Sequence, residues 1–92
     1  MTATPARAGA DPHLGSIRPV PPPTRHVCAT CVQLGTSWVH MRQCLTCGQV
    51  GCCDSSPMRH ASGHAALTGH VVVRSIEPGE SWRWCYADEQ FV

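Results

Sequence analysis

The alternation of hydrophobic and polar side chains predicts several short β-strands beyond residue 36. Residues 37–43 alternate with a period of two, residues 49–52 suit a shorter strand, and residues 71–76 form a continuous apolar run. Residues 81–86 alternate again after a Pro-Gly turn, and their aromatic side chains share one strand face: Trp82, Trp84 and Tyr86. We expect these segments to pair as an antiparallel sheet.

One main helix is predicted between the strands at 49–52 and 71–76. Ser56 can cap its first turn, Pro57 suits the first helical position, and Gly69 can end it in the left-handed conformation. One side of this helix carries two histidines four residues apart, His60 and His64. The other side is predicted to face the core: Met58, Ala61 and Ala65. The predicted fold class is therefore α+β, an antiparallel β-sheet with one main α-helix.

Residues 1–25 are rich in alanine and proline and show no pattern of a core element. We expect residues 1–10 to be disordered and this N-terminal segment to be largely so. Residues 19–25 are predicted to form a stiff spacer, because proline favours extended polyproline conformation. The folded domain is therefore expected to span residues 26–92.

A folding unit of about 65 residues buries too little apolar surface to be comfortably stable without metal, disulfides or a partner. Its cysteines and histidines supply a remedy, because thiolates and imidazoles are the ligands that zinc prefers. Cys28 with Cys31, and Cys44 with Cys47, form C-x2-C zinc knuckles. Further candidate ligands follow in order: Cys52, Cys53, His60, His64 and His70. Two structural zinc ions are predicted as cofactors.

A disulfide framework is the alternative use of these cysteines. Their odd number, the C-x2-C spacing and the lack of a secretory signal in the sequence favour free thiols in a reducing cytoplasm instead. The expected location is therefore cytoplasmic.

The spacing permits two ways of sharing eight ligands between two ions. In the sequential arrangement one ion takes Cys28, Cys31, Cys44 and Cys47, and the other takes Cys52, His60, His64 and His70. In the crossed arrangement one ion takes Cys28, Cys31, Cys52 and His60, and the other takes Cys44, Cys47, His64 and His70. Spacing alone does not decide between them.

The charge balance and the absence of certain motifs argue against three classes of function: nucleic-acid binding, membrane binding and catalysis. The net charge is +1, and every positive charge other than histidine is an arginine, so neither a nucleic-acid footprint nor a basic membrane patch is expected. No apolar run is long enough to cross a membrane. Two closed four-ligand sites without an H-E-x-x-H motif leave no open metal position, which argues against an enzyme. We expect a monomer, and the arginine, alanine and proline bias without lysine is typical of a GC-rich bacterial genome.

An ordered set of motifs then identifies a family resemblance over residues 26–92. C-x2-C is followed by C-L-T-C-G-x-V-G-C, by H-x3-H-x5-H ending in T-G-H, and by W-C-Y. This order resembles the ubiquitin-binding zinc finger of ubiquitin-specific proteases and histone deacetylases, the UBP-type finger, and is most similar to its free-standing bacterial members. The resemblance implies a sheet flanked by helices and the crossed arrangement of ligands, with Cys53 as a bystander thiol.

A third zinc site is carried by some members of that family. They use an N-terminal C-x-H-L and a W-C-x-x-C, where this chain has D-P-H-L and W-C-Y-A-D. The resemblance therefore implies a candidate third site in which aspartate replaces cysteine twice: Asp11, His13, Cys85 and Asp88. Carboxylates can bind zinc, although such a set is harder and weaker than one of thiolates.

The resemblance also implies a non-catalytic reader of protein C-termini, with a ubiquitin-like partner. In the family an aromatic pocket receives a free Gly-Gly tail, and an arginine fixes its carboxylate. Trp84 and Tyr86 match the aromatic residues, Trp38 is the candidate for the remaining wall, and Arg42 is expected at its edge. Asp54 stands where the family has its arginine, so a tail should shift toward Arg42 or the ligand is not anionic.

Two alternatives belong to other classes of function. A zinc-thiolate redox or metal-responsive regulator would use the spare thiol of Cys53. A nucleic-acid-binding zinc finger would need clustered basic residues, which the chain lacks.

Overall fold

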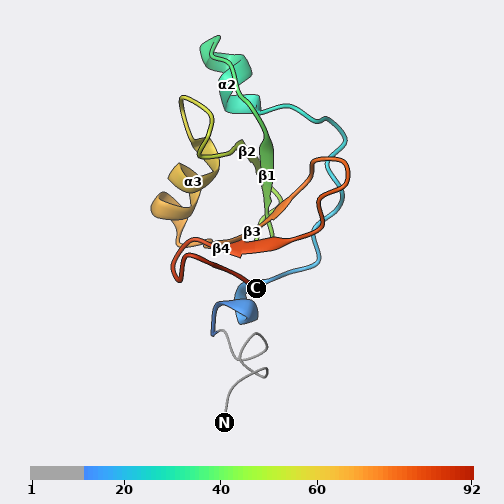
Figure 1. The fold of residues 1–92 in the computed structure, drawn as a ribbon, viewed down its shortest axis with the longest axis vertical. Helices are drawn as coiled ribbons and strands as arrows, with labels where there is room; N and C mark the ends of the chain where they lie inside the picture. Colours follow the sequence, from blue (N-terminus) through green and yellow to red (C-terminus); the bar gives the residue numbers. More distant parts are fainter. Residues whose placement is uncertain (1–11) are drawn as a thin grey trace.

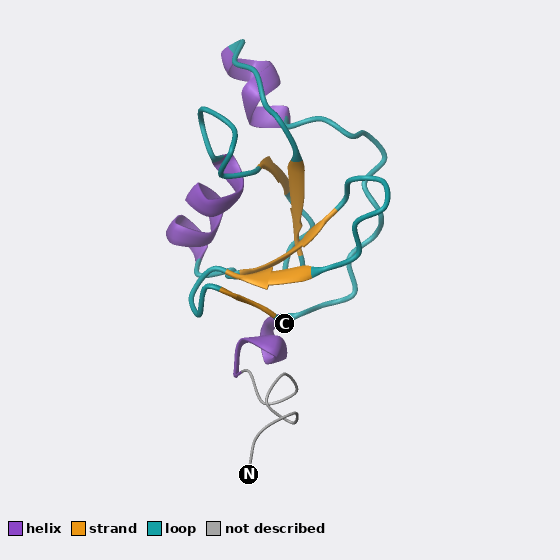
Figure 2. Ribbon diagram, in the orientation of Figure 1, coloured by secondary structure: helices purple, strands orange, loops and turns teal. Residues whose placement is uncertain are grey.

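The computed structural model describes residues 12–92 and contains one five-stranded antiparallel sheet with helices at its side and end (Figures 1 and 2). The sheet order is β2-β1-β3-β4-β5. Its strands are β1 (Met41–Cys44), β2 (Val50–Cys52), β3 (Val72–Ser75), β4 (Arg83–Cys85) and β5 (Gln90–Phe91). The helices are a 3-10 helix η1 (Pro12–Ser16) and two α-helices, α2 (Ala29–Leu34) and α3 (His60–Thr68). The predicted α+β class is confirmed.

Strand register decides which side chains share a face of the sheet. Arg42 pairs with Ser75, Val73 with Trp84, and Trp84 with Phe91. Directly paired residues in antiparallel strands point to the same side. One face therefore carries a guanidinium, a valine and two aromatic rings in neighbouring positions, and this face holds the groove described below.

The N-terminal segment covers the opposite face of the sheet. Ile17 and Val20 pack against a buried cluster of three residues, Leu45, Val72 and Cys85. The amide of Gln43, which is only 1% exposed, donates to the carbonyl oxygen of Pro21 at 2.9 Å. The expectation of a largely disordered segment therefore needs correction for residues 12–25, because apolar side chains beside the prolines pack onto the domain. The stiffness of residues 19–25 stays a prediction, and these residues contain neither helix nor strand. The expectation for residues 1–10 lies outside the described residues.

Helix α3 begins at His60, three residues later than the predicted start at Pro57. Arg59 precedes it in the left-handed conformation, with a φ of 49°. Ser56 is not a helix cap, since its buried hydroxyl accepts the backbone N–H of Val39 at 2.8 Å. Gly69 ends the helix with a φ of 78°, as predicted.

The predicted core side of this helix is right for two of its three residues. Ala61 and Ala65 are buried, but Met58 lies before the helix and is 44% exposed. A close contact explains the small residues here. A Cβ placed on Gly51 of β2 would lie 2.7 Å from the backbone nitrogen of Ala61, so the glycine allows α3 to rest on the sheet.

Other boundaries also differ from the sequence pattern. Cys28 is followed by helix α2 rather than by a bare turn, and Gly35 ends this helix with a φ of 72°. The strand predicted at residues 37–43 begins only at Met41. Strand β5 has two residues, which is too short to give a recognisable alternation.

Candidate metal centres and binding groove

Three thiols and an imidazole meet where α2, β2 and α3 come together: Cys28, Cys31, Cys52 and His60. The Nδ1 atom of His60 lies 3.3 Å from the Sγ atoms of Cys28 and Cys31, and 3.5 Å from the third sulfur. The Sγ atoms of Cys31 and Cys52 are 3.8 Å apart. Donors at about 2.0–2.3 Å from a tetrahedral zinc ion are separated by about 3.3–3.8 Å, so these side chains fit zinc as they stand.

A second set of four donors lies at the other end of α3: Cys44, Cys47, His64 and His70. Its donor atoms lie within 4.8 Å of one another, and Cys47 Sγ is 3.4 Å from His64 Nε2. The backbone N–H groups of Thr46 and Cys47 donate to Cys44 Sγ, and Gly48 has a φ of 86°, so this C-x2-C has the knuckle form predicted for it. The buried Nδ1 atom of His70 has no hydrogen-bond partner among residues 12–92. This is expected of a ring nitrogen whose lone pair is kept for a metal ion.

The electrostatics of this second set favour neutral side chains in the absence of a cation. Burial, and then the neighbouring Cys44, raise the pKa of the Cys47 thiol, although backbone hydrogen bonds oppose the shift. Burial, together with the nearby His70, lowers the pKa of His64. A neutral imidazole is the form that binds metal, and a bound cation would supply the charge that thiolates need.

The structure groups the donors as in the crossed arrangement and separates the pairs that the sequential arrangement would join. The register of the β1–β2 hairpin explains this grouping. Met41 pairs with Cys52 and Gln43 with Val50, so Cys52 and Cys44 lie at opposite ends of the hairpin. Helix α2 packs against β2 and so brings Cys28 and Cys31 to the Cys52 end.

A third group of donors joins the N-terminal segment to the turn after β4: His13, Cys85 and Asp88. His13 Nδ1 lies 2.9 Å from Asp88 Oδ2, and Cys85 Sγ lies 3.7 Å from the same oxygen. His13 is therefore close to Cys85, as the family resemblance implies. Asp11, the fourth residue of this candidate set, lies outside the described residues.

A groove of about 190 Å³ opens on the sheet face that carries the aromatic side chains. Its walls include Arg42, Asp54, Trp82, Trp84, Tyr86 and Phe91. The Phe91 ring meets Trp82 and Trp84 edge to face, with centroid distances of 5.5 and 5.1 Å. The in-phase aromatic face predicted for residues 81–86 is thus confirmed. Phe91 was not expected from the sequence, because only its pairing with Trp84 brings it there.

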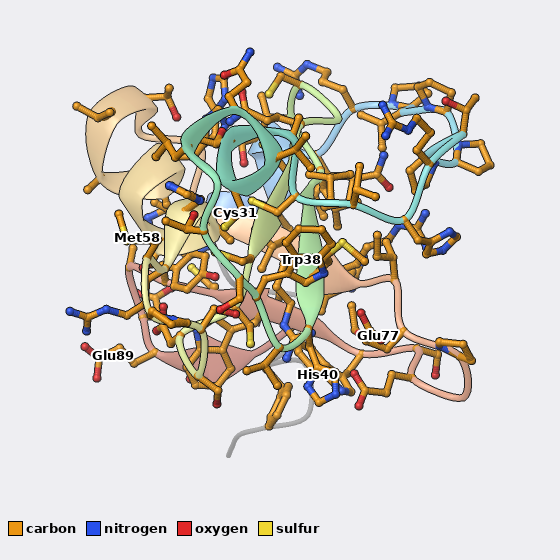
Figure 3. The ribbon with its side chains drawn as sticks, turned by 90° about the horizontal axis from the view of Figure 1, so that it is seen from above. Cys31, Trp38, His40, Met58, Glu77 and Glu89 are labelled. Atoms are coloured by element: carbon orange, nitrogen blue, oxygen red, sulfur yellow. The ribbon has the colours of Figure 1, made fainter. Side chains whose placement is uncertain are left out.

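Trp38 does not line this groove, and its assignment to the aromatic wall is wrong. The indole packs instead against the cluster formed by Cys28, Cys31 and Cys52, and Figure 3 shows Trp38 beside Cys31. The strand starts only at Met41, so the period of two that aligned Trp38 with Arg42 does not apply. Trp38 shields the first group of donors from solvent.

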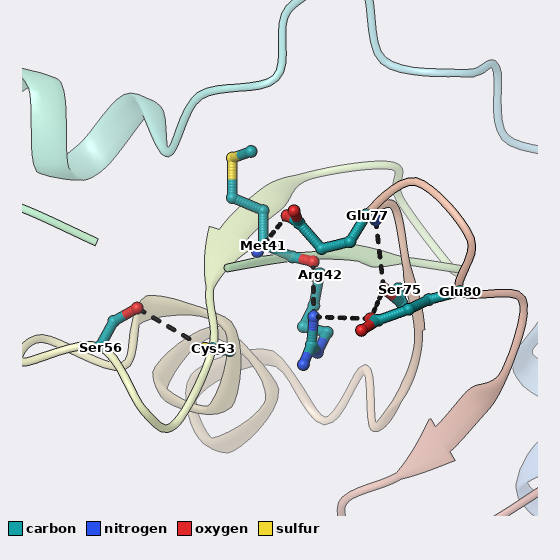
Figure 4. A network of polar contacts seen from close by, with 7 residues as sticks. All are labelled: Met41, Arg42, Cys53, Ser56, Ser75, Glu77 and Glu80. Atoms are coloured by element: carbon teal, nitrogen blue, oxygen red, sulfur yellow. Dashed lines mark hydrogen bonds and ion pairs between the residues drawn. The ribbon is translucent and has the colours of Figure 1, made fainter. Parts of the chain in front are cut away.

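Arg42 lines the groove, and its guanidinium lies close to an aromatic ring and to a carboxylate. The Cζ atom lies 4.5 Å from the centroid of the Trp82 ring, and Nη1 lies 3.9 Å from Oε1 of Glu80. Glu80 also accepts a hydrogen bond from the buried hydroxyl of Ser75 (Figure 4). The turn at residues 77–80 therefore positions a carboxylate against the groove's one guanidinium.

Asp54 and Cys53 also line the groove. The pKa of Tyr86 is raised to about 12, chiefly by burial and further by the negative charge of Asp54. Burial acts to raise the pKa of the Cys53 thiol, but the Ser56 hydroxyl, backbone hydrogen bonds and Arg42 lower it overall. Cys53 is 4% exposed and belongs to none of the three donor groups.

Two closed sets of cysteine and histidine donors on a small α+β domain define a zinc-finger type of protein. The chain belongs to the family described as the Zn-finger in ubiquitin-hydrolases and other protein, whose sequence model matches residues 26–92. A similar solved structure is the solution NMR structure of protein RPA1320 from Rhodopseudomonas palustris. The two sequences are 42% identical, the match covers 99% of this chain and 82% of that one, and the TM-score is 0.74. The comparison with curated proteins gives no match.

All seven cysteines lie within the described residues and none forms a disulfide there, which contradicts the disulfide framework. Among residues 12–92, no helix has both the length and the apolar character needed to cross a membrane.

Proposed function

We propose that the protein is a non-catalytic protein-interaction module, held in shape by two structural zinc ions, whose groove receives the free C-terminal tail of a partner protein. The first ion would be held by Cys28, Cys31, Cys52 and His60, and the second by Cys44, Cys47, His64 and His70. The first ion would cross-link α2, β2 and α3, and the second would cross-link β1, α3 and the segment before β3. Four protein donors in each set leave no open position for a substrate, which supports a structural role.

The observation that carries the proposal is the aromatic groove with Arg42 in its wall. Flat rings close to one another admit an extended backbone with small residues better than one with bulky side chains. A guanidinium can bind a terminal carboxylate through two hydrogen bonds. Glycine-ended tails, of which ubiquitin-like proteins offer one example, meet both requirements.

The third donor group is proposed as a weaker zinc site that also includes Asp11. Its ligands would be Asp11, His13, Cys85 and Asp88, and the mixture of carboxylates with one thiolate suits zinc less well than the other two sets. A His13→Ala variant should then lose one zinc per chain while the other two remain. An unchanged zinc content would show that the group is a hydrogen-bonded network only.

The proposed location is a reducing compartment such as the cytoplasm, because the thiols are free. The redox alternative is less well supported, since the spare thiol of Cys53 is almost completely buried.

Calorimetric titration of the zinc-loaded chain with a Gly-Gly-ended hexapeptide tests the proposed function. The free-acid peptide should bind more tightly than the same peptide with an amidated C-terminus, because only the former offers a carboxylate. Trp84→Ala should weaken binding, whereas Trp38→Phe, a change outside the groove, should not. Equal binding of the acid and the amide would contradict recognition of a free C-terminus.

A further inference from the structure

Two arginines lie directly opposite each other on the face of the sheet that is turned away from the groove. Arg74 of β3 pairs with Arg83 of β4, whereas the neighbouring pair, Val73 with Trp84, lines the groove. Like charges in directly opposite positions of an antiparallel sheet destabilise it. Neither guanidinium forms an ion pair with any residue from 12 to 92. The described domain therefore carries two adjacent positive charges that it does not neutralise.

A buried glutamine fixes the orientation of Arg74. The Nε atom of Arg74 donates to Oε1 of Gln43 at 2.9 Å. The amide nitrogen of Gln43 donates in turn to the carbonyl oxygens of Pro21 and Gly48, at 2.9 and 3.3 Å, so the position of Oε1 is determined. The two Nη groups of Arg74 donate to no residue from 12 to 92. This edge of the guanidinium is therefore left for a ligand, and it can bind two oxygen atoms of an oxoanion at once.

Arg83 completes the pair from the solvent side. Its Nη2 atom donates to the carbonyl oxygen of Val92 at 2.9 Å, and its remaining N–H groups donate to no residue from 12 to 92. Arg83 is exposed and Arg74 is half-buried. A small ligand can consequently reach both guanidinium groups from water.

The two carboxylates of the turn between β3 and β4 do not neutralise this pair. Glu80 lies beside Arg42 and accepts the hydroxyl of Ser75. Glu77 accepts the backbone N–H of Met41 at 3.0 Å. Both carboxylates are thus engaged with other groups, and the negative charge that would balance the arginine pair has to come from a ligand.

We propose that Arg74 and Arg83 form a binding site for a phosphate dianion, carried by free phosphate or by a small phosphate monoester. Two adjacent guanidinium groups supply two positive charges, which match a dianion, whereas a carboxylate or a phosphodiester carries only one negative charge. Guanidinium groups also bind phosphate through parallel hydrogen bonds that fit its oxygen atoms. The site lies on the face opposite the aromatic groove and is independent of the function proposed above.

NMR titration of the zinc-loaded full-length chain at constant ionic strength tests the site with four ligands: free phosphate, phenyl phosphate, dimethyl phosphate and benzoate. At about pH 8 the first two are mainly dianions, whereas the other two carry one charge. The dianions should bind about threefold to tenfold more tightly than the monoanions, as expected for one additional partly exposed ion pair. The side-chain Nε–H signals of Arg74 and Arg83 should shift most, and that of Arg42 should not.

Matched variants locate the site. Arg83→Gln should abolish the preference for phenyl phosphate over benzoate, because one guanidinium matches one negative charge. Arg74→Lys keeps the charge but loses the paired donors, so it should weaken the binding of phenyl phosphate about threefold. Arg59→Gln is the control, since Arg59 precedes α3, which rests through Gly51 on the groove face, and it should keep the preference. The zinc content of each variant confirms that its fold is intact.

The remaining outcomes decide the proposal. Equal affinity for all four ligands would overturn it and leave two hydrated arginines. Shifts centred on Arg42 would also overturn it, because phosphate would then bind in the groove. A preference that survives in Arg83→Gln, or that is lost equally in Arg59→Gln, would show only a general attraction of charge. Binding of phenyl phosphate without free phosphate would support the site and identify a monoester as its ligand, whereas equal binding of the two would support recognition of the phosphate group alone.

Discussion

Tyr86 is the residue whose chemistry best reports the conditions inside the groove. Tyr86 lines the groove, where its burial disfavours the phenolate, and the negative charge of Asp54 disfavours it further. The positive charge of Arg42 opposes the shift but does not cancel it. It is the only tyrosine in the chain, so the ultraviolet absorbance of phenolate reports on this position alone.

We expect Tyr86 to titrate near 12 in the folded protein rather than at its ordinary pKa of 10.0. Because the raised pKa means that the folded state holds its proton more tightly, the resulting stabilisation is complete below about pH 10 and is lost as the pH rises toward 12. Absorbance followed together with circular dichroism separates ionisation from unfolding. A midpoint near 10 in a chain that is still folded would show that Tyr86 is open to water.

The same residue-scale argument predicts the effect of reversing the charge of Asp54. Asp54→Arg removes a carboxylate that repels the end of a tail and places a guanidinium in the groove, so a Gly-Gly-ended peptide should bind about tenfold more tightly. Glu89→Arg changes the net charge equally at a site outside the groove and serves as the control. No gain with Asp54→Arg would show that the groove does not receive a carboxylate.

At the scale of elements, the contact between β2 and α3 controls both donor groups. His60 and His64 lie on α3, one turn apart, and belong to different sets of four donors. The helix can reach both sets only because Gly51 has no side chain between the sheet and Ala61. Small residues on the facing surfaces therefore determine where the histidines lie.

A Gly51→Ala substitution should consequently destabilise the domain by about 1–3 kcal/mol, since the added methyl group would meet backbone that cannot move freely. Gly63 in α3 is the matched control, because a Cβ there meets nothing within 4 Å. Gly63→Ala should stabilise the helix by about 0.5–1 kcal/mol. Thermal unfolding of the two zinc-loaded variants tests the contrast, and equal effects would show that α3 does not rest on Gly51.

The features that could be predicted from sequence are those fixed by local chemistry. The C-x2-C pairs have a geometry of their own, and Gly69 ends its helix because it alone accepts a positive φ without strain. The features that could not be predicted depend on contacts between distant segments. Ser56 does not cap the helix, because its hydroxyl accepts a hydrogen bond from the backbone N–H of Val39. Trp38 packs against the thiols of the first donor group, because strand β1 begins only at Met41 and Trp38 lies before it.

The residues that line the groove could likewise be predicted only in part from the sequence. Trp84 and Tyr86 could be placed from their alternation along one strand. Phe91 could not, because a strand of two residues has no period to recognise and joins the wall only by pairing with Trp84. Asp54 could be singled out by its position, but its lack of an ion partner is visible only once Arg42 is seen to face Glu80.

At the scale of the whole molecule, thiols take the place of a hydrocarbon core. Six of the thirteen buried apolar residues among residues 12–92 are cysteines, so the described domain buries few large aliphatic side chains. The two donor groups lie at opposite ends of one hairpin and tie it to α2, α3 and the segment before β3. Loss of either ion should therefore loosen several elements together rather than one.

Neighbouring cysteines allow this dependence on zinc to be tested with nearly identical substitutions. Cys52→Ser should lower the zinc content by one ion per chain and unfold the domain or lower its melting temperature greatly, because structural zinc contributes on the order of 10 kcal/mol of apparent folding free energy. Cys53→Ser should keep the zinc content of the wild type and cost only about 1 kcal/mol, since Cys53 is buried but contacts only Ser56 among the polar side chains shown in Figure 4. Metal analysis after gel filtration and thermal unfolding with and without a chelator provide the measurements. Equal zinc content in the two variants, or a chelated wild-type chain that keeps its tertiary structure, would show that the thiols pack without holding the metal.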